Sequence, residues 1–339
     1  MDCNSAAPTP PRSALRQLRK DPVLGRWVII SAERAKRPSD FAPSPEPGPG
    51  GKSCPFCPGN EAMTPPEVMR IPSQGRWQVR VVPNRFPALV TEGEPERQGC
   101  GIYDRMNGIG AHEVIIETPD HARRLTDLEP GEIEAVLHSF RERALDLHRD
   151  PRIRYIMVFK NEGASAGASL AHSHSQLIAT PIIPVLVKEE LAGARRYFDF
   201  RGRCIYCDMV RQELEESSRL VATGDRFVAF VPFAPRFPFE TWLVARDHFA
   251  TWQSLDDSRL ADLARILKEV LERLGRALGR PDYNFVLHTA PSGAGESEHY
   301  HFHLELLPKL SRIAGFEVGT GFYINPVAPE DSARYLREA

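Results

Sequence analysis

Residues 155–181 read YIMVFKNEGASAGASLAHSHSQLIATP, and the rest of the chain can be interpreted outward from this stretch. It opens on a run of β-branched and aromatic residues, Tyr155 to Phe159, which is typical of a buried strand. A loop of small residues follows and leads into a His-Ser-His-Ser-Gln segment. Side chains alternate along a strand, so His172, His174 and Gln176 would point to the same face. The stretch therefore predicts a strand that presents two imidazoles and an amide beside a glycine-bearing loop.

The loop from Asn161 to Ser169 indicates what these side chains act on. It contains Gly163 and Gly167, which let a phosphate group approach the backbone N–H groups. An isolated His-x-His motif would favour a different interpretation, a pair of surface histidines beside a flexible loop. The Asn, Gly and Ser positions of this loop favour an active site for a phosphorylated substrate.

The composition bounds the class of protein. The chain has 339 residues, of which 42% are hydrophobic and 26% are charged, as in soluble globular proteins. The net charge is -2, and no stripe of Lys and Arg with interleaved aromatic residues indicates nucleic-acid binding. No apolar run reaches the roughly 18 residues that a membrane span needs. The first twenty residues lack the apolar region of a secretory signal. We therefore expect a cytoplasmic protein that binds neither nucleic acid nor membrane.

The predicted elements follow the same order in the first and the second half of the chain. Residues 130–148 have the apolar spacing of an amphipathic helix and precede the opening strand, and residues 260–274 precede a similar strand at 283–287 in the same way. The strands that begin at Tyr155 and Tyr283 are 128 residues apart and His172 and His301 are 129 apart, whereas the equivalent cysteine pairs are 150 apart. We predict an α+β fold built from a duplicated unit, with a mostly antiparallel sheet shared by the two halves and crossing helices. The halves would be residues 15–183 and 184–339.

Four of the six cysteines form two Cys-x-x-Cys pairs. In each half, two histidines at equivalent positions accompany the pair, and thiolates with neutral imidazoles are the ligands that zinc prefers. A thioredoxin-like redox pair is the alternative, which is disfavoured because neither pair is placed to open a helix after a strand. We predict two structural zinc sites, the first formed by Cys54, Cys57, His121 and His172 and the second by Cys204, Cys207, His248 and His301.

This assignment leaves His174 in the first half and His303 in the second without a metal. A free imidazole beside a phosphate loop suits a nucleophile that accepts a phosphoryl-linked group, so His174 is the candidate. His303 lies among apolar residues and is interpreted as structural.

Four motifs carry a resemblance to a known family: Arg34-Ala35-Lys36-Arg37-Pro38, Pro83-Asn84-Arg85-Phe86-Pro87, Pro119-Asp120-His121 and Asn161-x₅-Gly167-x-Ser169-x₂-His172-x-His174-x-Gln176. Over nearly its whole length the chain resembles the galactose-1-phosphate uridylyltransferase family, a branch of the histidine-triad superfamily. Ser173 and Ser175 stand where the better-known members have Pro and Gly. The HSHSQ segment, the doubled Cys₂His₂ pattern and the segment FEVGTGFYINP at 316–326 are similar to plant-type members that act as ADP-glucose phosphorylases.

The resemblance implies a mechanism and a set of contacts. His174 would attack the α-phosphorus of a nucleotide sugar, and Gln176 would hold the phosphoryl oxygens without offering a base to water. Ping-pong kinetics and a possible homodimer are expected. The expected substrate contacts are Arg34, Arg37, Asn84, Asn161, Gly167, Ser169, Phe316 and Val318.

Three functions follow as hypotheses. The first is transfer of UMP between UDP-glucose and a hexose 1-phosphate through a nucleotidyl-histidine. The second is phosphorolysis of ADP-glucose by the same mechanism, with phosphate as the acceptor. The third, from a different class, is a double zinc-binding interaction module without catalysis.

Overall fold

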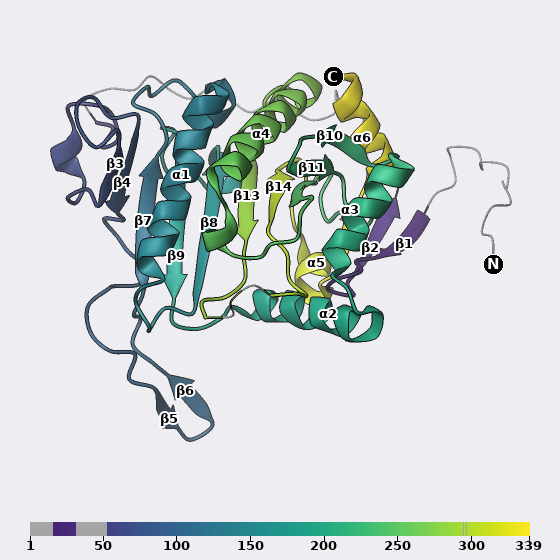
Figure 1. The fold of residues 1–339 in the computed structure, drawn as a ribbon, viewed down its shortest axis with the longest axis horizontal. Helices are drawn as coiled ribbons and strands as arrows, with labels where there is room; N and C mark the ends of the chain where they lie inside the picture. The colour runs from purple at the N-terminus through teal and green to yellow at the C-terminus, as the bar shows by residue number, and fades with distance from the viewer. Residues whose placement is uncertain (1–15, 32–52, 294, 296) are drawn as a thin grey trace, which may run out of the picture.

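The computed structural model describes residues 16–31, 53–293, 295 and 297–339. Its centre is a ten-stranded sheet in which every strand is antiparallel to its neighbours (Figure 1). From one edge to the other the strands are β3 (Met69–Ile71), β4 (Val79–Pro83), β7 (Ala111–Ile116), β9 (His174–Thr180), β8 (Tyr155–Glu162), β13 (Tyr283–His288), β14 (His303–Pro308), β12 (Thr241–Ala245), β11 (Phe227–Phe230) and β10 (Leu220–Thr223).

The sheet is symmetric about its centre, because equivalent strands of the two halves occupy equivalent positions on either side. β8 and β13 pair at the centre, with Asn161 opposite Asn284, and the His-x-His strands β9 and β14 flank them. The strands β7 and β12 come next on either side. The prediction of a duplicated α+β unit with a shared antiparallel sheet is confirmed.

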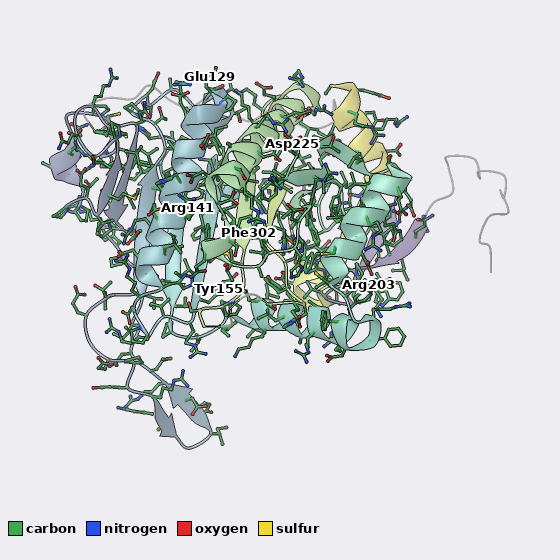
Figure 2. The ribbon with its side chains drawn as sticks, in the orientation of Figure 1. Glu129, Arg141, Tyr155, Arg203, Asp225 and Phe302 are labelled. Atoms are coloured by element: carbon green, nitrogen blue, oxygen red, sulfur yellow. The ribbon has the colours of Figure 1, made fainter. Side chains whose placement is uncertain are left out.

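Two long helices, α1 (Pro130–Leu147) and α4 (Asp257–Leu278), cover one face of the sheet (Figure 1). α1 starts with Pro130 at its first position, and the N-cap residue of α4, Asp256, accepts a hydrogen bond from the Arg259 N–H. The apolar side chains of both helices pack on the sheet in one core, where burying a leucine contributes about 2 kcal/mol. Arg141 of α1, labelled in Figure 2, donates to the carbonyl of Leu255 and pairs at 2.8 Å with Asp257, the first residue of α4, and so links the two helices. Both predicted helices are confirmed.

The opposite face carries the predicted site. Along β9, Leu177 and Ala179 point into the core under α1, so His174 and Gln176 point to the other face. In the second half, α2 (Val185–Arg201) and α3 (Ile205–Glu216) pack on that same face. α3 starts directly after Cys204, but it follows the helix α2 and not a strand.

The remaining elements lie outside the large sheet. β5 (Gln98–Cys100) and β6 (Tyr103–Arg105) form a hairpin that projects from the body (Figure 1), and α5 (Gly315–Thr320) and α6 (Pro329–Glu338) lie in the second half. β1 (Arg16–Lys20), β2 (Trp27–Ser31) and β15 (Tyr323–Asn325) form a small sheet. β2 thus pairs with a strand of the second half, and the division of the chain at 183 and 184 stays a prediction. None of the described helices is both long and apolar enough to cross a membrane.

Candidate active site

His174 is the first residue of β9, and its surroundings leave one ring nitrogen available. The Nδ1–H donates to the carbonyl of His172 at 2.8 Å, so Nε2 keeps its lone pair. The side chain is 6% exposed, and this burial lowers the pKa of His174. The Phe56 ring lies edge-on to it at 5.3 Å between ring centroids. The imidazole is therefore neutral near pH 7, which a nitrogen nucleophile requires.

His174 lines a cavity of about 420 Å³. His174 and Gln176 line it together with Asn84 and Ser169, and Phe56 and Leu170 contribute apolar walls. A cavity with apolar walls and a few convergent polar groups is typical of a small-molecule site. Four of the residues expected at the site are thus brought together.

The loop after β8 is held by the second half of the chain. Asp282 accepts a hydrogen bond from the Ser165 N–H at 2.8 Å, and a Cβ at Gly163 would lie 1.9 Å from its Oδ1. Gly163 has φ 82°, so both conformation and contact require glycine at this position. Asn284 donates to the Ala166 carbonyl at 2.9 Å and to Asn161 Oδ1 at 2.8 Å. These contacts direct the Asn161 amide nitrogen away from Asn284.

The reverse side of the His174 strand rests on a buried carboxylate. Glu117 accepts hydrogen bonds from Ser175 at 2.5 Å, Ser173 at 2.6 Å and Lys160 Nζ at 2.7 Å. Lys160 also forms an ion pair with Glu162 at 3.0 Å. Burial alone would lower the pKa of Lys160, but the two carboxylates outweigh it and raise the pKa. The two serines on either side of His174 thus bind the strand to the Glu117–Lys160 ion pair, in which the carboxylates raise the pKa of Lys160.

The first predicted zinc site is assembled. His172 Nδ1 lies 3.6 Å from Cys54 Sγ and 3.7 Å from Cys57 Sγ, and His121 Nδ1 lies 3.4 Å from Cys57 Sγ. A tetrahedral zinc ion about 2.3 Å from sulfur and about 2.0 Å from nitrogen requires S···N separations of about 3.6 Å. His172 Nε2–H donates to the Thr118 carbonyl at 2.7 Å, which leaves Nδ1 as the metal-binding atom. The donor set fits zinc.

The second cluster has the same geometry. The S···N separations are 3.4 Å for Cys207 and His248, 3.6 Å for Cys207 and His301, and 3.8 Å for Cys204 and His301. His301 Nε2–H donates to the Ala245 carbonyl at 2.8 Å. Both groups of four place their ligand atoms within 4.8 Å of one another, so both can hold a metal ion.

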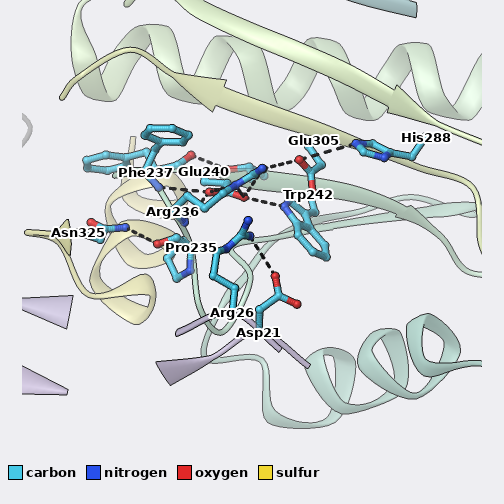
Figure 3. A network of polar contacts seen from close by, with 12 residues as sticks. Asp21, Arg26, Pro235, Arg236, Phe237, Glu240, Trp242, His288, Glu305 and Asn325 are labelled. Carbon is cyan, nitrogen blue, oxygen red and sulfur yellow. Dashed lines mark hydrogen bonds and ion pairs between the residues drawn. The ribbon is translucent and has the colours of Figure 1, made fainter. Parts of the chain in front are cut away.

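The position equivalent to His174 in the second half is closed. His303 is 1% exposed beneath Tyr206, with 4.8 Å between ring centroids, and burial together with the neighbouring His288 lowers its pKa to about 4. Arg236 pairs with Glu240 at 3.0 Å and with Glu305, which occupies the position equivalent to Gln176 (Figure 3). His303 thus has no open cavity comparable to that at His174.

Two buried residues beside His303 were not anticipated from the sequence. His288 Nδ1 lies 3.1 Å from a Glu190 carboxylate oxygen, and the His288 and His303 rings stack at 4.5 Å. Glu190, His288 and His303 form a third group whose ligand atoms lie within 4.8 Å. Glu190 lies on a helix that sequence patterning did not place at this sheet, and no spacing motif links it to the histidines.

Other expected contacts lie elsewhere. Arg34 and Arg37 fall outside the described residues. Phe316 and Val318 lie on α5 with 47% and 78% of their surface exposed, and they are not among the residues that line the cavity. Their expected role as substrate contacts stays a prediction, as does assembly into a homodimer.

Comparison with family models matches almost the whole chain. Residues 8–184 match the N-terminal domain of galactose-1-phosphate uridyl transferase, and residues 190–332 match its C-terminal domain.

Curated relatives align over nearly their full length. An ADP-glucose phosphorylase from Arabidopsis thaliana is 42% identical over 95% of this chain and 92% of its own length. A galactose-1-phosphate uridylyltransferase from Thermotoga maritima is 30% identical over 96% of this chain and 98% of its own.

Solved structures agree with these relatives. An ADP-glucose phosphorylase from Arabidopsis thaliana with bound ADP-glucose superposes with a TM-score of 0.82 at 39% identity, covering 96% of this chain and 99% of that one. A uridylyltransferase structure superposes with a TM-score of 0.75 at 31% identity, covering 95% of this chain and 97% of that one.

Proposed function

Because the chain belongs to the galactose-1-phosphate uridylyltransferase family, we propose that it transfers a nucleotidyl group from a nucleotide sugar through His174. The observation that carries the proposal is the Nε2 lone pair of a neutral, buried imidazole that lines the cavity. Nε2 attacks the α-phosphorus, a P–N bond forms, and the bond to the β-phosphate oxygen breaks. The sugar 1-phosphate leaves with the electron pair of that bond. An acceptor phosphate then attacks the same phosphorus and releases the histidine.

The groups around His174 stabilise the charge that develops on the phosphoryl oxygens. The donors would be the Gln176 amide nitrogen and the Ser169 hydroxyl, which line the cavity, together with the Asn161 amide nitrogen and the backbone N–H groups of the glycine loop, which are not among the lining residues. None of them is a base that activates water, so the nucleotidyl-histidine persists until the acceptor binds. Ping-pong kinetics follow.

Two zinc ions complete the fold of the proposed enzyme. Held by the two Cys₂His₂ clusters, they would supply structural cross-links, because all four positions of each ion are filled by the protein. The first zinc site fixes His172, two residues before the nucleophile, and so holds the start of β9 in place.

We favour ADP-glucose as the nucleotide sugar and phosphate as the acceptor, which gives glucose 1-phosphate and ADP. The support is the 42% identity to an ADP-glucose phosphorylase, against 30% to a uridylyltransferase over a similar share of the chain. Transfer of UMP between UDP-glucose and a hexose 1-phosphate is the second candidate, since that relative aligns over 98% of its length.

The test is a covalent adduct assay without acceptor. Protein incubated with ADP-glucose or UDP-glucose labelled at the α-phosphorus should retain label from ADP-glucose after denaturation, at one equivalent per chain. His174→Asn should abolish the adduct, whereas the matched variant His303→Asn in the second half should retain it. Label from UDP-glucose alone would support the second candidate. No label from either would overturn nucleotidyl transfer and favour the non-catalytic zinc module.

Acceptors distinguish the two reactions. Phosphate should discharge the adduct as ADP, and galactose 1-phosphate should leave it intact. Discharge of the adduct by galactose 1-phosphate and not by phosphate would show that the acceptor is a hexose 1-phosphate, as in the second candidate function.

A further inference from the structure

His112 on β7 is a histidine that no motif of the chain singles out. It lies beside Gln176 on the neighbouring strand, with 2.8 Å between His112 Nε2 and Gln176 Oε1. It also contacts Asn84, whose amide nitrogen lies 3.1 Å from the same Nε2. Gln176 and Asn84 both line the cavity, and His112 is not among the lining residues. Any effect of His112 on the substrate therefore acts through these two side chains.

The backbone decides which nitrogen of His112 carries the proton. The Ala88 N–H can only donate, and it donates to His112 Nδ1 at 3.1 Å. In a neutral imidazole with Nδ1 as acceptor, the proton lies on Nε2. Nε2–H therefore donates to Gln176, and the atom that faces it must be the Gln176 carbonyl oxygen.

The Asn84 amide does not decide the proton position, because it turns a donor toward His112. The Phe86 N–H donates to Asn84 Oδ1 at 2.9 Å, which fixes that amide with its nitrogen toward His112. His112 Nδ1 already accepts from the Ala88 N–H, so Nε2 carries the proton, and the 3.1 Å contact with the Asn84 nitrogen joins two donors and is not a hydrogen bond. Gln176 Oε1 is the acceptor that remains at this nitrogen.

We propose that His112 is a positioning residue which fixes the amide of Gln176 with its NH₂ group toward the cavity. This inference rests on the proposed nucleotidyl transfer at His174 and deepens it. With the carbonyl oxygen bound by His112, the two N–H groups of Gln176 are available to the phosphoryl oxygens. In the reversed orientation the carbonyl oxygen of Gln176 would face the phosphoryl oxygens. An acceptor would then stand in place of two donors, and the two groups would repel each other.

Two substitutions separate the two bonds of His112. In His112→Asn the amide oxygen stands near the place of Nδ1 and still accepts from Ala88, but nothing reaches Gln176. In His112→Gln the longer amide reaches the place of Nε2 and can donate to Gln176. His112→Asn should slow adduct formation about 10-fold to 100-fold. This factor corresponds to loss of one hydrogen bond from Gln176 to the charged phosphoryl group. His112→Gln should restore part of that rate.

A double-variant cycle tests whether the effect passes through Gln176. Single-turnover rates are measured for wild type, His112→Asn, Gln176→Ala and the double variant, with nucleotide-sugar affinity, zinc content and unfolding midpoint recorded for each. The inference requires that His112→Asn causes little further loss once Gln176 is alanine. Equal losses in both backgrounds, or a wild-type rate in His112→Asn, would overturn it.

The proton position is measured without substrate. Nitrogen-15 spectra of histidine-labelled protein, assigned by difference from His112→Asn, should show a protonated Nε2 and an unprotonated Nδ1. The opposite tautomer overturns the inference even if the adduct forms normally. No adduct in the wild-type protein would overturn the proposed function itself and, with it, the role of His112.

Discussion

Replacing Glu117 with glutamine tests whether the buried Glu117 carboxylate stabilises the strand that carries His174. The carboxylate is 2% exposed and accepts from Ser173, Ser175 and the fully buried Lys160. An amide of the same shape has one acceptor oxygen and turns an NH₂ group toward a donor. The variant therefore leaves at least one buried donor without an acceptor and removes half of the negative charge that faces Lys160.

The cost follows from the buried pair. Removing one partner of a buried ion pair destabilises a protein by about 3–5 kcal/mol. Lys160 keeps its contact with Glu162 at 3.0 Å, so we expect the lower end, about 3 kcal/mol. Total stabilities are about 5–15 kcal/mol, so this loss is large enough to be measured directly.

The assay is urea unfolding at fixed zinc concentration. Glu189→Gln on the exposed face of α2 removes the same charge and should change the free energy of unfolding by less than about 0.5 kcal/mol. Glu117→Gln combined with Lys160→Met should lose less than the sum of the single variants. A loss below about 1 kcal/mol for Glu117→Gln, or additive losses, would refute the role given to the carboxylate.

Three further predictions concern the metal, the loop and the second half. Cys57→Ser should lower the zinc content from two ions to one per chain by elemental analysis; two remaining ions would contradict the first cluster. Asn284→Asp should weaken nucleotide-sugar binding about tenfold by calorimetry, because it places a carboxylate against the Ala166 carbonyl; unchanged affinity would show that the loop is held otherwise. For His288, burial is outweighed by Glu190, and the pKa rises to about 10. The stabilisation is therefore fully present below about pH 6.5 and lost as pH rises through about 10. The difference in unfolding free energy between wild type and His288→Asn should shrink between pH 6 and pH 10.5, and a constant difference would contradict the pairing.

The sequence predicts those parts of the molecule that depend on rare residue types at fixed spacing. The pairs at Cys54 and Cys204, with histidines repeated in both halves, indicate the two clusters and the duplication from the sequence alone. His174 is predicted as the nucleophile because it is the histidine of the His-x-His motif that does not bind the metal.

Residues that act across strands could not be found in this way. His112 lies opposite Ile178 in the register and reaches Gln176 diagonally, so its role depends on sheet pairing and not on spacing. Asp282 and Asn284 belong to the other half of the chain. The helix α2, which brings Glu190 to His288, has a weak apolar pattern and was not predicted.

The clamp that Asp282 and Asn284 place on the glycine loop bears on how a duplicated gene keeps both of its copies. A copy that loses its reaction is free to decay unless it takes over another task. Here the second half buries His303 beneath Tyr206, yet Asn284 of its central strand and the adjoining Asp282 hold the loop that would bind substrate phosphate in the first half. Under the proposed reaction at His174, substitutions at Asp282 and Asn284, more than a hundred positions away, would disturb the substrate loop of the first half, so each half would depend on the other.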